Sequence, residues 1–377
     1  MTAADDVNRA KEQGPDPALR SPATKPPVPK VGLLLVNLGT PESAELKDVF
    51  PYLNEFLMDR RVLTMPAIIR WMLVNLVILP TRPQHSADAY ARIWSEQGSP
   101  LRVAHEALSE AVQNAFANDR NVVVEHAMRY GKPSIRSKIA SMIEDGMEQL
   151  VVFPLYPQYA SSTTGTVLEE VMDSIRGEWN IPSFCTVPAF YDDKYFVDAV
   201  IAAGKEAHHA FDADHVLFSF HGLPEDHLHN SDPSKSHCLS ADDPASMACC
   251  EKIGAHNRFC YRAQCLHTAR AIASALSLGD DEWTLSFQSR LGRAEWIKPY
   301  TDSTVKELAR AGKKRLAVYC PAFVADCLET LEEIGMEAKD TFVEAGGEDL
   351  RLIPCVNSHS TWVQGVVQLA KKSSAWL

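Results

Sequence analysis

The stretch 31-VGLLLVNLG-39 is a continuous run of apolar residues that ends in Asn37 and Gly39, with Pro41 two residues later. Such an unbroken run is typical of a strand that is buried on both faces in a parallel sheet. Glycine and proline after the run predict a sharp turn out of the strand. A helix is expected to begin in the segment that follows, 42-ESAELKDVFPYL-53. A strand, a turn and a helix in this order predict the first unit of an α/β fold.

The same kind of short apolar run recurs along the chain. Helical patterns lie between the runs, for example 102-RVAHEALSEAVQNAFA-117 and 301-TDSTVKELARAG-312. Strands that alternate with helices predict a parallel sheet. The further expected strands lie in the segments 121-NVVVEHAMRYG, 148-EQLVVFPLYP, 214-DHVLFSFHGLP, 283-WTLSFQSR, 315-RLAVYCPAF and 349-DLRLIPCV.

Two halves of similar build are expected. The length of 377 residues allows two domains of ordinary size. The segment from residue 151 combines a strand, a proline and a helix start, and the segment from residue 316 repeats this order. We therefore expect one domain over residues 31–195 and a second over residues 196–377. Residues 1–30, rich in proline, alanine and charge, are expected to be a disordered tail.

The composition narrows the class of protein. The chain is 46% hydrophobic and 23% charged, as is usual for a soluble globular protein. Its formal net charge of −12 argues against nucleic acid or a generally anionic membrane as a partner. No apolar segment of signal-peptide type is found in residues 1–30, so a cytoplasmic location is expected.

One apolar window, 62-VLTMPAIIRWMLVNLVIL-79, has three interpretations: a membrane span, a core helix, or an exposed surface that touches lipid or an oily ligand. A spanning helix needs about 20 residues. The window is shorter than that and contains Pro66, Arg70 and Asn75. A central arginine alone costs about 2.5–3.5 kcal/mol on insertion scales. These features favour the exposed surface, with the flanking arginines at the level of lipid headgroups.

The candidate site lies where strands end, because ligands of open α/β sheets bind at the carboxyl ends of the strands. His221 directly follows the apolar run 216-VLFSF-220. Gly222 permits a tight turn after it, and Pro224 restricts the next φ angle. A lone histidine at such a point is more often structural than functional. A functional role for His221 therefore needs further candidate residues at a second strand end.

Acidic residues follow the expected strand at residue 315. Asp326, Glu329, Glu333 and Glu337 are spaced by three, four and four residues, which places them on one face of a helix. A solvated acidic face explains such a row equally well on its own. Asp326 and Glu329, however, fall in the first turn after a strand, where a carboxylate can bind a cation or accept a proton. A histidine and a glutamate from two strand ends suit Fe(II) or a proton-transfer pair.

Five motifs in this order, LLLVNLGTP, PLYPQYASSTTG, LFSFHGLP, SFQSRLGRAEWIKPYT and PAFVADCLETLEEI, resemble those of the ferrochelatases, the last-stage enzymes of haem synthesis. The resemblance runs from about Val31 to Gln368. It implies insertion of Fe(II) into protoporphyrin IX to give protohaem, with release of two protons. It also implies two Rossmann-like domains of the chelatase type with the porphyrin in the cleft between them, and a monomer or homodimer.

The resemblance also assigns residues. His221 and Glu329 match the family's active-site histidine and glutamate, and both are expected to meet the iron. Glu333 and Glu337, with Asp326, match an acidic row that is proposed as a route for protons or metal. The segment 57–83 matches an apolar lip at the active site that touches the membrane. The residues that match the porphyrin-binding positions are Tyr90, Ser99, Met128, Arg129, Tyr130 and Trp296, of which Trp296 has core packing as its alternative role.

A cysteine-rich insertion is expected over residues 230–266. In a cytosolic protein, cysteines this dense are more often metal ligands than disulfides. Four thiolates suit zinc or an iron–sulfur cluster, and free thiols are the third possibility. Because some ferrochelatases carry a 2Fe–2S cluster, the resemblance favours that cofactor. The expected ligands are Cys238, Cys250, Cys260 and Cys265, with Cys249 as the alternative to Cys250.

The animal-type cluster site is expected to be absent, since Ser161 stands at its internal cysteine position and the C-terminal segment has no cysteine. Cys327 stands where some family members have a second histidine. Two other functions remain open at this point. One is iron insertion into coproporphyrin III, and the other is a haem- or iron–sulfur-dependent regulator on a chelatase scaffold.

Overall fold

The computed structural model describes residues 28–119, 121–239, 246–292 and 294–377. Most of the expected tail, residues 1–27, and part of the cysteine-rich segment, residues 240–245, lie outside the described residues.

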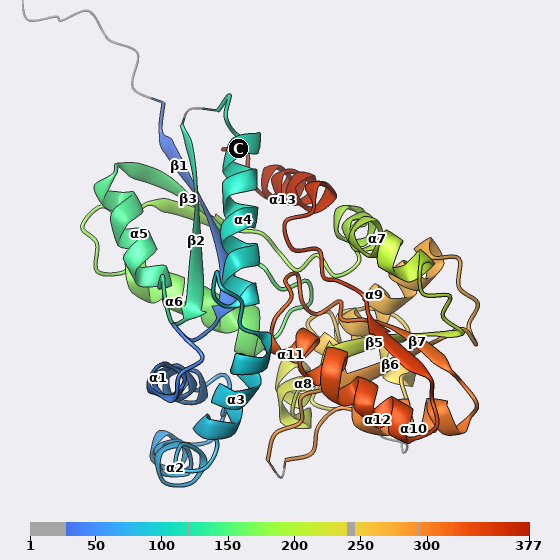
Figure 1. Cartoon of the computed structure of the whole chain (residues 1–377). Helices are drawn as coiled ribbons and strands as arrows, with labels where there is room; N and C mark the ends of the chain where they lie inside the picture. The colour runs from blue at the N-terminus through green and yellow to red at the C-terminus, as the bar shows by residue number, and fades with distance from the viewer. Residues whose placement is uncertain (1–27, 120, 240–245, 293) are drawn as a thin grey trace, which may run out of the picture.

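The first half of the chain forms a four-stranded parallel sheet with helices around it (Figure 1). Its strands are β1 (Lys30–Gly39), β2 (Val122–Tyr130), β3 (Met147–Pro154) and β4 (Ser183–Thr186). Its helices are α1 (Leu46–Leu57), α2 (Ala67–Met72), α3 (Pro83–Ile93), α4 (Pro100–Ala115), α5 (Ile135–Glu144) and α6 (Thr166–Ile175), with π-helical turns η2 (Leu73–Ile78) and η3 (Ser161–Gly165).

The second half forms another four-stranded parallel sheet. Its strands are β5 (His215–His221), β6 (Trp283–Gln288), β7 (Arg315–Tyr319) and β8 (Asp349–Leu352). Its helices are α7 (Lys194–His209), α8 (Glu225–Ser231), α9 (Tyr261–Ala275), α10 (Thr301–Arg310), α11 (Leu328–Leu331), α12 (Lys339–Glu344) and α13 (Ser360–Ser373), with a 3₁₀ turn η4 (Ala248–Cys250) and a π-helical turn η5 (Glu333–Ala338).

The two sheets have the same topology. Their strand orders are β2-β1-β3-β4 and β6-β5-β7-β8, so the second half repeats the first strand by strand. β3 and β7 belong to the two segments that repeat the order strand, proline and helix start, and they occupy equivalent places in their sheets. The π-helical turn η3 follows β3, and η5 follows β7 after the short helix α11. The predicted α/β fold with parallel sheets is confirmed. The strand β4 was not predicted, because it is a short edge strand whose half-exposed residues carry no apolar run.

The C-terminal helix joins the halves. In Figure 1, α13 lies beside both α4 of the first half and α7 of the second. Its Trp362 is fully buried and its ring lies 6.5 Å from that of Phe153 on β3. We propose a domain boundary near residue 195, at the start of α7, since the first sheet ends before it and the second begins after it.

The apolar window is not a core helix. None of the residues of α2 is buried, and Val74 is the buried residue of η2. Ile68, Trp71 and Leu76 are 75%, 51% and 61% exposed. Within the described part of the chain, no helix is both long enough and apolar enough to cross a bilayer. The window is therefore an exposed apolar lip.

Candidate active site

His221 lies at the carboxyl end of β5, the central strand beside β6 and β7. Its Nδ1 lies 2.6 Å from the carbonyl oxygen of Gly222. A carbonyl oxygen only accepts hydrogen bonds, so Nδ1 carries the proton and donates it. In the neutral imidazole, Nε2 then keeps its lone pair for a proton or a metal ion.

Close packing explains the glycine after His221. A Cβ atom at Gly222 would lie 2.8 Å from the carbonyl oxygen of Gln288 and 3.1 Å from the ring of Trp296. The peptide N–H of Gly222 donates to that same Gln288 oxygen at 2.8 Å. A side chain would push the turn away from β6, and with it His221.

Aromatic side chains enclose His221. The rings of Trp296 and Phe323 lie 6.4 and 6.3 Å from the imidazole. The Trp296 Nε1–H donates to the carbonyl oxygen of Leu291 at 3.1 Å, which fixes the orientation of the indole. Trp296 is only 8% exposed, so it serves as packing around His221 in this conformation. Its stacking against a porphyrin stays a prediction.

Glu333 is the carboxylate that the structure ties most firmly to the end of β6. It accepts hydrogen bonds from the peptide N–H and the hydroxyl of Ser289, at 2.7 and 2.5 Å. Burial raises the pKa of Glu333, and these hydrogen bonds and the nearby charge of His221 oppose that rise. Glu329 also raises this pKa, so His221 and Glu329 both act on Glu333. Gln288, the register partner of His221, donates to the carbonyl oxygen of Glu329 at 2.6 Å and to the Glu333 carboxylate at 3.3 Å.

Glu329 faces the first half of the chain. Its charge raises the pKa values of Tyr52 and Tyr90, although burial is the larger cause for both phenols. The Cys327 thiol forms a hydrogen bond with Glu329. Tyr90 is thus the predicted substrate residue that the structure brings next to the predicted catalytic glutamate, across the junction of the two halves.

Four other predicted substrate residues are buried or hydrogen-bonded to neighbours within the first half. Ser99 accepts a hydrogen bond from Thr40 at 2.8 Å, and Met128 is fully buried. Arg129 and Tyr130 both donate to the Asp59 carboxylate, each at 2.8 Å. Contact of these four side chains with a porphyrin stays a prediction.

The outer part of the acidic row lines a cavity of about 230 Å³. Glu333 and Glu337 both face it, together with Ser289, Asp302 and Thr341. Asp326 is absent from this lining. Its carboxylate instead holds a neighbouring loop, accepting from the Asn357 side chain at 2.7 Å and from the Cys355 peptide at 3.2 Å.

The cysteine-rich segment brings four sulfurs together. The Cys249 and Cys250 sulfurs lie 3.7 Å apart, Cys250 contacts Cys260, and Cys260 contacts Cys238. Hydrogen bonds from the Cys238 and Cys250 thiols lower the pKa of Cys260, against the effect of burial. The fifth cysteine, Cys265, instead pairs with the hydroxyl of Tyr261.

The contacts form a chain from Cys249 through Cys250 and Cys260 to Cys238. Among the residues that the structure describes, no group of three or more His, Cys, Asp or Glu side chains is arranged to hold a metal ion. The thiols are therefore neighbours without the closed geometry of a metal site.

Buried polar groups order the segment around these cysteines. The Asp232 carboxylate accepts from the peptide N–H groups of Ser234, His237 and Cys238 at 2.7–3.0 Å. The Asn257 side chain donates to the Cys249 carbonyl oxygen at 3.0 Å. The backbone that carries the thiols is thus held from both sides.

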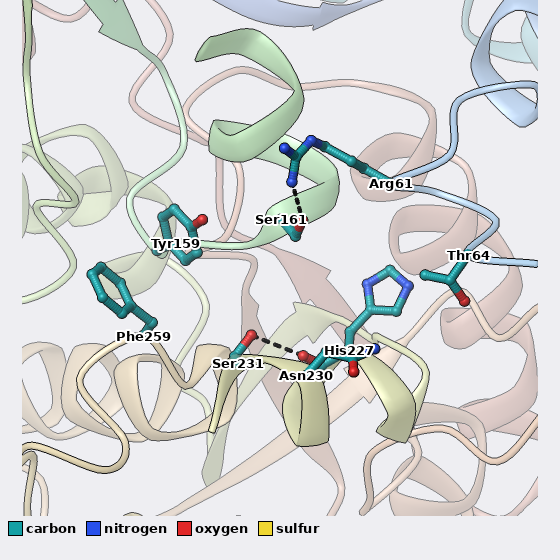
Figure 2. Close-up of a pocket in the computed structure, with 8 residues that line it drawn as sticks. All are labelled: Arg61, Thr64, Tyr159, Ser161, His227, Asn230, Ser231 and Phe259. Atoms are coloured by element: carbon teal, nitrogen blue, oxygen red, sulfur yellow. Dashed lines mark hydrogen bonds between the residues drawn. The ribbon is translucent and has the colours of Figure 1, made fainter. Parts of the chain in front are cut away.

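A second cavity, of about 270 Å³, lies between the halves below the lip. Figure 2 shows the Arg61 side chain reaching Ser161, to which it donates at 2.8 Å, with His227 and Ser231 on the opposite wall. Phe259, the neighbour of Cys260, also lines it. None of the predicted catalytic residues faces this cavity.

Comparison with known proteins tests the family resemblance. The family profile described as ferrochelatase matches residues 30–374. The chain belongs to the ferrochelatase family. A ferrochelatase of Stutzerimonas stutzeri (strain A1501) is 48% identical over 90% of this chain and 97% of its own length. One from Coxiella burnetii (strain CbuK_Q154) is 43% identical over 91% of this chain and 94% of its own.

A solved structure extends the likeness to the fold. SirB from Bacillus subtilis with Fe3+ superposes with a TM-score of 0.52 at 12% identity, covering 92% of this chain and 96% of that one. At that identity the likeness concerns the fold alone. The two parallel sheets of this ferrochelatase-family chain therefore form a chelatase-type fold.

Sequence reasoning missed several residues that build the site. Gln288 donates to the carbonyl oxygen of Glu329 at 2.6 Å, and Ser289 holds Glu333. Gln288 is the last residue of β6 and Ser289 follows it, so the rule that ligands bind at strand ends contained the signal that had already selected His221. Asp59, which holds Arg129 and Tyr130, had no such signal, because it lies in a loop far from them in the chain.

Proposed function

We propose that this protein inserts Fe(II) into protoporphyrin IX to give protohaem, with His221, Glu329 and Glu333 at the site of insertion. The observation that supports the proposal is Gln288 at the end of β6, which pairs in register with His221 and donates to the Glu329 carbonyl oxygen and the Glu333 carboxylate. Family membership supplies the reaction class.

The reaction exchanges one Fe(II) for the two N–H protons of the free-base macrocycle, so charge and atoms balance. His221 is suited to accept one of these protons or to offer a ligand to iron, since its Nε2 lone pair is free. Glu329, on the side of Tyr90, supplies a second acceptor. The rings of Trp296 and Phe323 beside His221 suit contact with a flat macrocycle.

Glu333 suits the next transfer. Burial raises its pKa, so it holds a proton more readily than an exposed glutamate does. The cavity of about 230 Å³ then leads from Glu333 to Glu337, whose side chain is 53% exposed. We propose that protons leave, or iron arrives, along this row. Asp326 is the least supported member of the route, because its carboxylate is engaged by Asn357 and Cys355.

The choice of protoporphyrin IX over coproporphyrin III as the substrate rests on the exposed apolar lip. Coproporphyrin III carries four carboxylates and protoporphyrin IX two, and the exposed apolar surface of α2 and η2 suits the more apolar ring. A comparison of kcat/KM on the two porphyrins tests this choice. We expect protoporphyrin IX to be preferred, and a preference for coproporphyrin III would overturn it.

We propose that the lip, residues 57–83, makes peripheral contact with a membrane in a cytoplasmic protein that is a monomer or homodimer. Trp71→Glu should lower binding to lipid vesicles about tenfold or more, since burying one large apolar side chain contributes about 1.5–3 kcal/mol. Trp179→Glu is the matched control, because Trp179 is 97% exposed and lies outside the lip. Cosedimentation with vesicles measures both variants, and equal losses would contradict the contact.

We also propose a resident 2Fe–2S cluster, with zinc as the alternative, although the described thiols are not arranged around a metal site in this structure. The thiols of Cys238, Cys249, Cys250 and Cys260 are the set that the contacts favour, and Cys249 thus takes the place expected for Cys265. Thiolate ligands suit either metal group. Such a cluster would cross-link the segment 230–266 and add a redox-active centre outside the site of iron insertion.

A further inference from the structure

An ion pair joins the two halves of the molecule beside the proposed site. Arg92 of α3 pairs with Glu332, the residue between α11 and η5, and its guanidinium lies 3.9 Å from the Glu337 carboxylate. Figure 1 shows α3 next to α11, so the pair connects the first sheet's helices to the acidic row. The Glu332 side chain is 7% exposed and that of Arg92 is 48% exposed.

Each partner is placed on an element of the site. Tyr90, two residues before Arg92, is the residue whose phenol is influenced by Glu329. The carbonyl oxygen of Glu332 accepts from the peptide N–H groups of Met336 and Glu337, at 3.1 and 3.0 Å, and so begins the π-helical turn that carries Glu333. A movement of Glu332 is therefore passed directly to the acidic row.

Elsewhere the halves are held by buried hydrogen bonds. Gln158 of the first half donates to Thr268 at 2.9 Å and to the carbonyl oxygen of Pro321 at 3.2 Å. The Tyr159 peptide donates to the Gln264 side chain at 2.6 Å. The Gln158 hydrogen bonds are buried, whereas the Arg92 side chain is 48% exposed. The ion pair between Arg92 and Glu332 is therefore a contact between the halves that solvent reaches from the side of Arg92.

Two predicted porphyrin-binding aromatics are covered in this conformation. Tyr90 and Trp296 are 6% and 8% exposed, and Leu328 of α11 packs against the cluster that contains Tyr90. Binding of a porphyrin against Tyr90 therefore requires α3 to separate from α11, and that movement breaks the pair between Arg92 and Glu332. Once Arg92 leaves, the buried Glu332 carboxylate loses its counter-charge, and this favours closing again.

We propose that Arg92 and Glu332 form an ionic clamp that opens to admit the porphyrin or release its metal complex and closes over the bound ring. Arg92 is then a positioning residue for the proposed iron insertion, on which this inference rests. It brings α3 against the segment that carries Glu329 and Glu333.

The test compares Arg92→Glu, Arg92→Gln and Arg92→Lys in the full-length protein. Stopped-flow fluorescence measures dissociation of protoporphyrin IX, and steady-state assays give kcat and KM separately. We expect Arg92→Glu, which repels Glu332 and Glu337, to speed porphyrin dissociation and lower kcat, each by about tenfold or more. Arg92→Gln should be intermediate, and Arg92→Lys should restore most of both rates.

Arg136→Glu is the matched control, since Arg136 and Glu170 form an ion pair 3.1 Å apart within the first half. It should change neither rate more than about twofold. A purely structural role for Arg92 would lower the melting temperature and leave the dissociation rate unchanged, and that result overturns the clamp. If the wild type binds porphyrin and inserts no iron, the proposed function fails, while the dissociation rates still decide for or against the clamp.

Discussion

His221→Ala should lower kcat for iron insertion by about 10²–10⁴-fold, the usual contribution of a positioned proton acceptor. The reason lies in the hydrogen bond from Nδ1 to Gly222, which leaves Nε2 as the group that can take a pyrrole proton or bind iron. Alanine removes that nitrogen while the turn at Gly222 is kept. Single-turnover assays measure the effect with porphyrin already bound, which separates chemistry from binding.

Glu329→Gln should cause a loss of similar order, because the amide keeps the size of the side chain and removes its ability to accept a proton. His209→Ala is the control, since His209 is exposed at the end of α7, away from the site. Should both His221→Ala and Glu329→Gln retain the wild-type rate, the site would be wrongly assigned. If Glu329→Gln lost activity and His221→Ala did not, the acidic row and not His221 would accept the proton.

The second large effect concerns Cys260→Ser, which should bleach the visible absorption of the proposed cluster and destabilise the protein. Cys260 contacts both Cys238 and Cys250, so it is the central thiol of the chain of four. Loss of a bound group held at a hundred times its Kd costs about 2.7 kcal/mol. In a domain of 150–250 residues, that corresponds to a melting temperature lower by roughly 5–11 °C.

Two further variants separate the possible ligand sets. Cys249→Ser should bleach the cluster as Cys260→Ser does, whereas Cys265→Ser should keep it, because the Cys265 thiol pairs with Tyr261. Bleaching by Cys265→Ser with colour kept in Cys249→Ser would return the assignment to the set expected from the sequence. Unchanged colour and melting temperature in Cys260→Ser would contradict ligation altogether. Metal analysis of the purified protein distinguishes iron and sulfide from zinc.

The fold was predictable because most of its strands carry apolar runs. The run 31-VGLLLVNLG-39 gives the clearest signal, and apolar segments occur where β1, β2, β3, β5, β6, β7 and β8 lie, although only Leu350 of β8 is buried. The edge strand β4 carries no such signal, since its residues are half-buried or exposed. The topology of the second sheet repeats that of the first. This explains why the segments that begin at residues 151 and 316 share the order strand, proline and helix start.

The site was predictable only where a strand end and a motif coincide. His221 fulfils both conditions, and Glu329 and Glu333 lie in a motif that follows β7. Gln288 links the three, and their catalytic roles stay predictions. Arg92 and Glu332 fulfil neither, because an ion pair between residues 240 positions apart is invisible to local patterns. The choice between Cys249 and Cys250 as a ligand likewise stays open, because spacing along the chain does not fix where the thiols point.

The most direct measurement is anaerobic turnover. Purified protein is mixed with ferrous iron and protoporphyrin IX, and the absorbance change from free base to haem is followed. We predict many turnovers per protein molecule, with two protons released per haem formed. Binding of protoporphyrin IX with no metal insertion, and none on coproporphyrin III either, would contradict the chelatase and leave a haem- or iron–sulfur-dependent regulator on the same scaffold.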